Sequence, residues 1–169
     1  TAPADDFNHT LAFDGEGQEY DRHDFNGTQF NIFRQWNYVY WPVAKANTFF
    51  AHYDDLVSMH GDKWTKLNRF RGEALFLRSA YYFFGVQMWG SLPLVTTRPD
   101  ATNLTNTPVP EVYAQIITDL KEVIDNNLLP EWTALAPADK GRITMSAAKS
   151  VLAKVYLQKA SHSQAAAAG

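Results

Sequence analysis

Five acidic residues lie close together near the start of this 169-residue chain: Asp14, Glu16, Glu19, Asp21 and Asp24. Paired carboxylates could hydrolyse a glycosidic bond if they were held about 5 to 10 Å apart. Oxygen ligands at alternate positions could also bind calcium, but the glycine needed sixth in an EF-hand loop is Glu19 here. The glycine-dotted context fixes neither geometry, so a solvated acidic loop is the favoured interpretation.

Aromatic and polar side chains alternate from this loop up to position 41, in a pattern suited to ligand binding. Sugar rings offer C–H faces to aromatic planes and hydroxyl groups to amides, carboxylates and guanidinium groups. Tyr20 belongs to no helical period and Trp41 points away from that of the surrounding helix, so both are predicted as stacking platforms. Asp21, Arg22 and Asn37 are the predicted polar partners. Core packing is the alternative for each single ring.

The remaining residue types indicate neither a metal nor a cofactor. The five histidines never occur at metal-ligand spacing, there is no cysteine, and no glycine-rich loop precedes an apolar helix. The formal net charge of −3, without any lysine or arginine run, argues against nucleic acid. No apolar run reaches the ~18 residues that would span a bilayer. The first ten residues lack the features of a signal peptide.

Helical periodicity dominates the chain from about position 30 onward. The first helical stretch contains Pro42, which predicts either one bent helix or two helices with the proline in the first turn of the second. A third helix, after the long apolar one considered next, is expected to begin at Pro108 with Thr107 as its N-cap. Thr144 is the expected cap of the last helix.

The second helix has almost no polar face. Its longest apolar seam is predicted to be buried, beside a parallel seam through Leu75 and Tyr82. Because such a helix must be surrounded by others, truncation of Leu77 within the longest seam is expected to cost about 2–5 kcal/mol. Arg78 and Glu73 are expected to be buried or half-buried partners of loops, not catalysts. The longest seam consists of Phe70, Ala74, Leu77, Tyr81, Phe84 and Met88.

The third helix carries one apolar stripe, and its acidic residues, including Asp119, are predicted to face solvent. The helices are interpreted as two long hairpins. Each hairpin has one apolar face to bury, and the two hairpins can bury these faces by stacking on each other. The predicted fold is therefore all-α, with tetratricopeptide-like helical hairpins in a layered array, and a plain helical bundle is the alternative. The expected divisions are a loop at 1–28, a helical domain at 29–160 and a truncated or unassigned tail at 161–169.

Four stretches resemble, in the same order, the motifs of the SusD/RagB family of surface nutrient-binding lipoproteins. They are "WNYVYWPVAKANTFF", "RGEALFLRSAYYFFGVQMWGSLPLVT", "PVPEVYAQIITDLKEVIDNNLLP" and "GRITMSAAKSVLAKVYLQKA", and together they cover positions 36–160. The lipid-bearing cysteine and the second half of that family are absent. Matching residues include Trp36, Tyr40, Asn47, Gly72, Glu73, Ala74, Arg78, Gly90, Pro93, Val112, Tyr113, Asp119, Leu120, Gly141, Arg142, Thr144, Ala148 and Tyr156.

The resemblance implies a non-catalytic binding subunit, lipid-anchored on the extracellular face of the outer membrane. Such a protein would cover a SusC-like TonB-dependent transporter and capture an oligosaccharide or a peptide. Membrane attachment would use a lipid anchor not present in this chain, and neither a cofactor nor nucleic acid is implied. Two other classes stay open on the residues alone. One is a tetratricopeptide-like adaptor that binds only protein, and the other is an all-helical carbohydrate-active enzyme.

Overall fold

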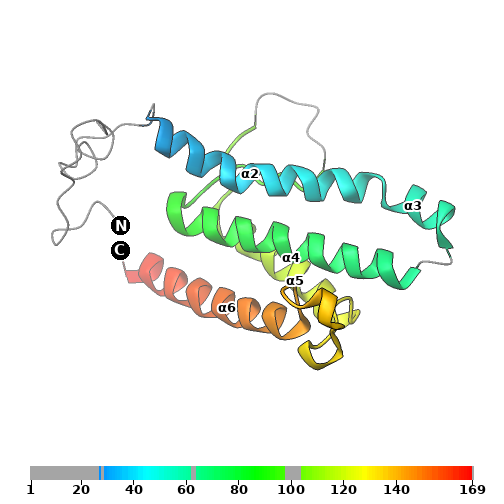
Figure 1. Ribbon diagram of the computed structural model, residues 1–169. Coiled ribbons are helices and arrows are strands. Elements are labelled where there is room, and N and C mark those ends of the chain that lie inside the picture. The colour runs from blue at the N-terminus through cyan, green and yellow to red at the C-terminus, as the bar shows by residue number, and fades with distance from the viewer. Residues whose placement is uncertain (1–26, 28, 62–63, 98–103, 169) are drawn as a thin grey trace, which may run out of the picture. The chain divides into compact units, whose positions relative to one another are not determined.

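The computed structural model describes residues 27, 29–61, 64–97 and 104–168, so the predicted acidic loop with Tyr20, Asp21 and Arg22 lies outside the described residues. The chain divides into two compact units, Thr1–Tyr38 and Val39–Gly169. The larger unit contains the later part of α2 (Phe30–Ala51), all of the remaining helices and the candidate network described below (Figure 1). The helices that follow α2 are α3 (Tyr53–Met59), α4 (Trp64–Trp89), α5 (Val109–Asp125), η2 (Trp132–Ala134), η3 (Pro137–Asp139) and α6 (Met145–Ala168).

The proline in the first helix does not end it. Helix α2 continues through Pro42 to Ala51, so the alternative with the proline in the first turn of a new helix is wrong. The break comes instead at His52, which precedes α3 without a side-chain cap. An interior proline removes one backbone hydrogen bond, and in α2 the helix nevertheless runs on for more than two turns beyond it.

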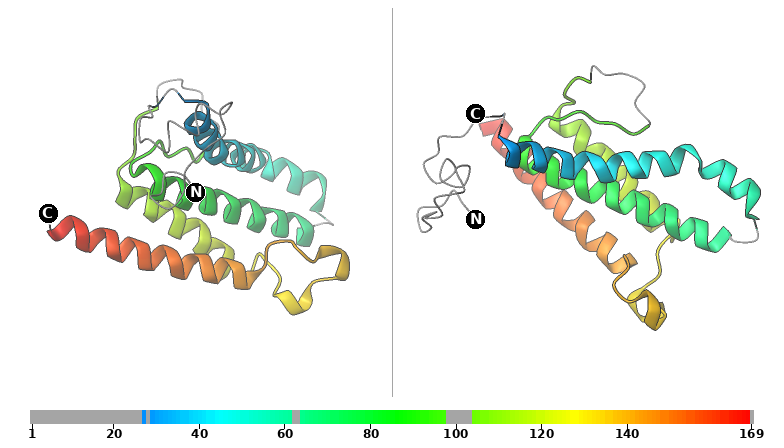
Figure 2. Two further views of the ribbon diagram at one scale, coloured as in Figure 1. Left: turned by 60° about the vertical axis from the view of Figure 1, so that its left-hand side comes forward. Right: turned by 45° about the horizontal axis from the view of Figure 1, so that its top comes forward.

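The larger unit is a stack of helices, which confirms the all-α, tetratricopeptide-like prediction. Both views in Figure 2 show α4 running beside α5, and α5 beside α6. The only β-structure among the described residues is one isolated antiparallel bridge between Leu92 and Thr107, which closes the base of the connection from α4 to α5. Helix α6 continues past position 160, where the sequence placed the end of the helical domain, as far as Ala168.

The two faces of α4 differ in burial, whereas the sequence predicted that both would be buried, so the prediction is wrong for one of them. The inner face, defined by Leu75, Arg78, Ser79, Tyr82 and Val86, is buried. The outer face, the longest seam of the sequence, keeps a large exposed fraction at Phe70, Leu77, Phe84 and Met88. Periodicity could not separate the faces because both are apolar, and the helices of this chain pack on the inner one. The outer face consists of Phe70, Ala74, Leu77, Tyr81, Phe84 and Met88.

Helix α5 buries its predicted stripe but also a carboxylate. Val112, Ile116 and Leu120 are fully buried, as periodicity indicates. Asp119, predicted to face solvent, is only 2% exposed, so that prediction is wrong. The physical reason is an ion pair with Arg78 on α4, which a single-helix pattern cannot show.

The two predicted N-caps have different outcomes. The Thr144 hydroxyl accepts a hydrogen bond from the backbone N–H of Ala147 at 3.3 Å, which confirms its predicted role at the start of α6. The prediction for Thr107 is wrong, because Pro108 occupies the cap position of α5 without a side-chain bond. Thr107 instead pairs with Leu92, and its hydroxyl accepts a hydrogen bond from the N–H of Leu94.

Candidate functional site

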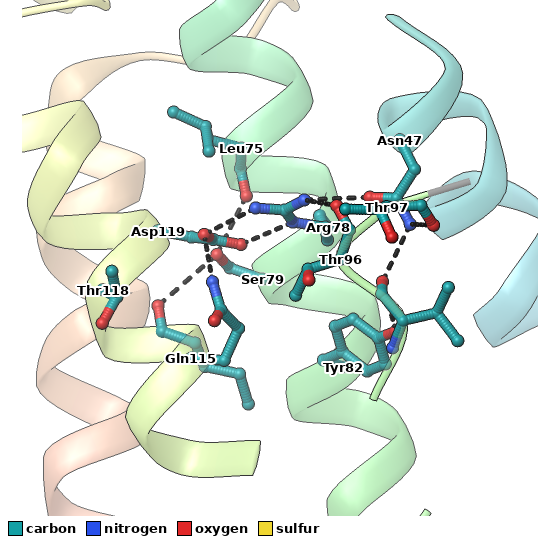
Figure 3. A network of polar contacts seen from close by, with 12 residues as sticks. Asn47, Leu75, Arg78, Ser79, Tyr82, Thr96, Thr97, Gln115, Thr118 and Asp119 are labelled. Carbon is teal, nitrogen blue, oxygen red and sulfur yellow. Dashed lines mark hydrogen bonds and ion pairs between the residues drawn. The ribbon is translucent and has the colours of Figure 1, made fainter. Parts of the chain in front are cut away.

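A buried polar network lies where α2, α4 and α5 meet, and Arg78 is its centre (Figure 3). The guanidinium of Arg78 holds Asp119 with two bonds, Nε to Oδ2 at 2.7 Å and Nη2 to Oδ1 at 2.8 Å. Its Nη1 donates to the Asn47 side chain at 2.9 Å and to the Thr96 carbonyl at 3.1 Å. Gln115 also donates to Asp119, so every charge in the network has a partner.

The same network fixes the extended segment that follows α4. The amide of Asn47 donates to the carbonyl groups of Val95 and Thr97 at 2.8 and 3.2 Å. The hydroxyl of Tyr82 accepts from the N–H of Val95 at 2.7 Å and lies 2.9 Å from its carbonyl oxygen. Together these bonds join α2, α4 and the segment that follows α4, so Arg78 acts as a positioning residue for that segment. This agrees with the prediction that Arg78 is a buried partner of a loop.

Burial keeps the two tyrosines of this region neutral. Burial raises the pKa of Tyr82 to about 12, and burial together with the neighbouring Tyr82 raises the pKa of Tyr40 still further. The Tyr40 hydroxyl donates to the carbonyl of Pro93 at 2.8 Å. Both phenols therefore serve as hydrogen-bonding anchors, and neither pKa favours a role as a general base at neutral pH.

A second polar cluster joins the start of α4 to the connection before α6. Arg142 holds Glu73 with two bonds of 2.9 and 2.7 Å, which confirms the prediction that Glu73 is a half-buried partner of a loop. Asp139 accepts hydrogen bonds from Arg69 at 2.9 Å and Arg142 at 3.3 Å, and these bonds lower the pKa of its carboxyl group. With their oxygens held by arginines, these carboxylates are arranged for structure and not for catalysis.

No group of three or more His, Cys, Asp or Glu side chains in the described part of the chain is arranged to hold a metal ion. The polar clusters described above pair carboxylates with guanidinium groups, and such pairing leaves no free base beside a nucleophile.

Two of the five predicted ligand residues, Asn37 and Trp41, belong to the described part of the chain, and both lie on α2. Asn37 is half-buried, whereas Trp41 is 66% exposed, as its predicted direction away from the helical period requires. The Trp41 side chain makes no hydrogen bond or ring contact with another described residue. An exposed indole without a partner is a ready surface for a sugar ring or a peptide side chain.

The smaller unit holds an exposed aromatic group built around Arg34, a residue that the sequence analysis did not consider. The guanidinium of Arg34 lies over the rings of Phe30 and Tyr38, at 5.5 and 5.8 Å from their centroids. Arg34 also donates to the Tyr38 hydroxyl at 2.9 Å. The signal was available, because residues four apart share a helix face.

A family model matches residues 6–157 of the chain. The model is SusD-like and carries the description "Starch-binding associating with outer membrane". Among curated proteins, a SusD-like protein of Bacteroides ovatus is 31% identical over 135 residues. That alignment covers 76% of this chain but 23% of the relative. No helix in the described part of the chain is both long and apolar enough to cross a membrane.

Solved structures give the same result. A laminarin-binding SusD-like protein aligns with a TM-score of 0.73 and 30% identity, over 89% of this chain and 32% of its own. A structure with a xylogluco-oligosaccharide aligns with a TM-score of 0.71 and 25% identity, over 89% and 28%. A SusD superfamily protein from Parabacteroides distasonis aligns with a TM-score of 0.69 and 26% identity, over 83% and 29%. This chain thus spans less than a third of the relatives it matches.

Proposed function

Because the chain belongs to the SusD-like family, we propose that it forms part of a non-catalytic carbohydrate-binding protein of the bacterial outer-membrane surface. The observation that carries the proposal is the family match over nearly the whole chain. Two structural relatives, one named for laminarin binding and one solved with a xylogluco-oligosaccharide, support a carbohydrate as the ligand class. Family membership also supports the expectation of binding without turnover.

In this proposal the larger unit is the scaffold, and Asn37 and Trp41 on α2 form part of the ligand site. Trp41 is the stacking platform among the described residues, because its ring is 66% exposed and makes no hydrogen bond or ring contact with them. Asn37 supplies an amide, and Tyr20, Asp21 and Arg22 remain proposed partners from the preceding segment. Ring stacking plus a few oriented hydrogen bonds is the usual chemistry of neutral sugar recognition.

The proposed partner is a SusC-like TonB-dependent transporter, with the protein held at the extracellular face of the outer membrane by a lipid anchor outside this chain. The description of the family as associating with the outer membrane supports this location. Co-purification of the complete gene product with a transporter from detergent-extracted outer membranes would test the partnership. Recovery of the protein in a periplasmic or culture fraction, with no transporter attached, would contradict it.

Ligand binding is tested in the complete gene product by isothermal titration with laminari-oligosaccharides, xylogluco-oligosaccharides and a peptide library. Trp41→Ala combined with Tyr20→Ala is expected to weaken oligosaccharide affinity by about tenfold or more, which corresponds to about 1.4 kcal/mol. Trp132→Ala is the matched control, because Trp132 is also exposed but lies on η2, far along the chain. The control is expected to bind as the parent does.

The outcomes separate the alternatives. Unchanged affinity in the double variant would place the ligand site elsewhere in the protein, and binding of peptides alone would replace the ligand class. Binding of neither ligand class, together with tight binding of another protein, would favour the tetratricopeptide-like adaptor. Release of shortened oligosaccharides on incubation would show an enzyme.

A further inference from the structure

A polar hollow of about 310 Å³ opens where α3, the start of α4 and the end of α5 meet. Helix α3 lies beside the start of α4 (Figure 1). The volume falls at the lower end of the range of about 300–1,000 Å³ that is usual for small-ligand pockets. Trp41 lies outside the hollow, about 15 Å along α2 from the end of that helix at Ala51. The hollow is lined by Tyr53, Asn68, Arg71, Glu122, Asn126 and Leu128.

Asn68 supplies an amide donor to the polar hollow. Its Oδ1 accepts a hydrogen bond from the Tyr53 hydroxyl at 2.8 Å, which fixes the oxygen end of the amide. Its Nδ2 has no hydrogen-bond partner among the described residues. Tyr53 is itself buried, and the guanidinium of Arg71 covers its ring at 4.9 Å from the centroid. Asn68 is therefore held in one orientation before a ligand arrives, and a donor held in advance loses less entropy on binding.

Glu122 and Asn126 supply acceptors from the end of α5. Arg71 donates from Nε, at 2.9 Å, and from Nη2 to the same oxygen of Glu122, Oε1. Glu122 Oε2 accepts no hydrogen bond from a described residue, so a carboxylate whose charge is already paired keeps one free acceptor. The Nδ2 of Asn126 donates to the Glu122 carbonyl at 3.0 Å, which leaves Asn126 Oδ1 as a second acceptor.

The charges around the polar hollow select a neutral ligand. The Glu122 carboxylate disfavours an anion, and so does the negative partial charge at the C-terminal end of α5. The Arg71 guanidinium disfavours a cation. Each hydroxyl group can donate one hydrogen bond and accept others, so adjacent hydroxyl groups on a ligand suit a wall that offers one donor and two acceptors.

We propose that the polar hollow is a second carbohydrate site. A neutral sugar donates hydroxyl protons to Glu122 Oε2 and Asn126 Oδ1 and accepts a hydrogen bond from Asn68 Nδ2. The choice of a sugar rests on the proposed function, but the site uses none of the residues proposed there. Tyr53 offers no bare ring for stacking, because Arg71 covers it. Binding through a few hydrogen bonds is weak, with a dissociation constant on the order of 1 mM. A long glycan held at two sites dissociates more slowly than one held at a single site.

Isothermal titration of the complete gene product with laminaritriose, carried to millimolar concentrations, tests the proposal. Asn68→Asp replaces the Nδ2 donor by an oxygen, while Oδ1 still accepts from Tyr53. This variant is expected to weaken the weaker of two binding events at least tenfold and to leave the tighter event unchanged. Asn106→Asp adds the same charge at an exposed asparagine outside the hollow, and this control is expected to bind as the parent does. Asn126→Ala, at an exposed position where truncation leaves the fold intact, is a second variant with the same expected loss.

Two results would overturn the proposal. One is a titration in which neither Asn68→Asp nor Asn126→Ala weakens any binding event. The other is tighter binding of trialanine than of laminaritriose, lost in the same two variants, which would assign the hollow to peptides. In the variant with Tyr20→Ala and Trp41→Ala the weaker event is expected to persist, so failure of the proposed ligand site and failure of the hollow give different titration curves. Absence of any carbohydrate binding by the parent would contradict both proposals.

Discussion

Both faces of α4 carry large apolar side chains, yet the inner face is buried by this chain and the outer face stays partly exposed. On the inner face Tyr82 and Ser79 have no exposed surface, and Arg78 connects three elements. On the outer face Leu77 and Phe84 contact solvent over two fifths of their surface. Apolar side chains thus indicate that a helix packs against other helices, but they do not say on which face. The buried ion pair identifies the face on which the neighbouring helix packs.

The largest expected effect comes from breaking the charge pair of the inner face. Arg78→Ala leaves the buried Asp119 carboxylate without its counter-ion and is expected to lower the free energy of unfolding by about 3–5 kcal/mol. Urea unfolding followed by circular dichroism measures it. Lys149→Ala removes a surface ion pair with Glu131 and serves as the control, with little change expected. A loss below about 1 kcal/mol for Arg78→Ala would mean that the network is not a source of stability.

Two leucines on the same helix test the comparison directly. Leu75→Ala on the inner face creates a cavity and is expected to cost about 2–5 kcal/mol. Leu77→Ala on the outer face of the 169-residue chain is expected to cost less than about 1 kcal/mol, because its side chain is already partly hydrated. The sequence alone predicted the larger cost for Leu77. Equal losses in the two variants, measured by urea unfolding, would show that the chain covers both faces.

Removal of the Tyr82 hydroxyl tests how the inner face of α4 holds the segment that follows the helix. Tyr82→Phe leaves the N–H of Val95 without its acceptor and is expected to cost about 1–3 kcal/mol. Hydrogen exchange of the backbone around Val95 is expected to become faster than that of the α5 interior. Tyr156→Phe, at an exposed tyrosine of α6, is the control. Unchanged exchange near Val95 would show that the bonds from Tyr40, Asn47 and Arg78 hold the segment without Tyr82.

The smallest effect concerns the half-buried cluster of Arg69, Glu73, Asp139 and Arg142, which contrasts with the fully buried pair. Arg69 and Arg142 lower the pKa of the Asp139 carboxyl group below its usual value of 3.8. A lowered pKa in the folded state stabilises the fold above pH 3.8, and this stability is lost as the pH falls through the folded-state value. Asp139→Asn is expected to reduce the difference between the urea midpoints at about pH 5 and about pH 3. An unchanged difference would exclude Asp139 as a source of acid sensitivity.

The fold was largely predictable from local patterns. The helices around positions 30–50, 64–89, 109–125 and from 145 onward follow from apolar periodicity, and the cap at Thr144 follows from its residue type and position. Thr107 shows the limit of that reasoning. It has the residue type of a cap, but its backbone pairs with Leu92 and its hydroxyl accepts from Leu94, and the pairing depends on a residue 15 positions earlier.

The candidate site was predictable only in part. Trp41 could be assigned to the surface because its helical phase differs from that of the buried positions. Asp119 could not be assigned to the interior, because an acidic residue on an amphipathic helix faces solvent unless a distant cation meets it. The cation is Arg78, 41 positions away, and neither its helix nor its phase identifies it as the partner of Asp119.

The buried pair of Arg78 and Asp119 also sets the register between α4 and α5. If α5 slid by one turn, about 5.4 Å, its apolar stripe would still meet apolar side chains, but both charges would be buried without a partner. Apolar packing alone would tolerate that slip, and the guanidinium with its fork of donors does not. We expect a variant with Arg78→Met and Asp119→Leu to keep its helix content. Its amide resonances would broaden as the two helices sample more than one alignment, and sharp, single resonances would show that packing alone determines the alignment.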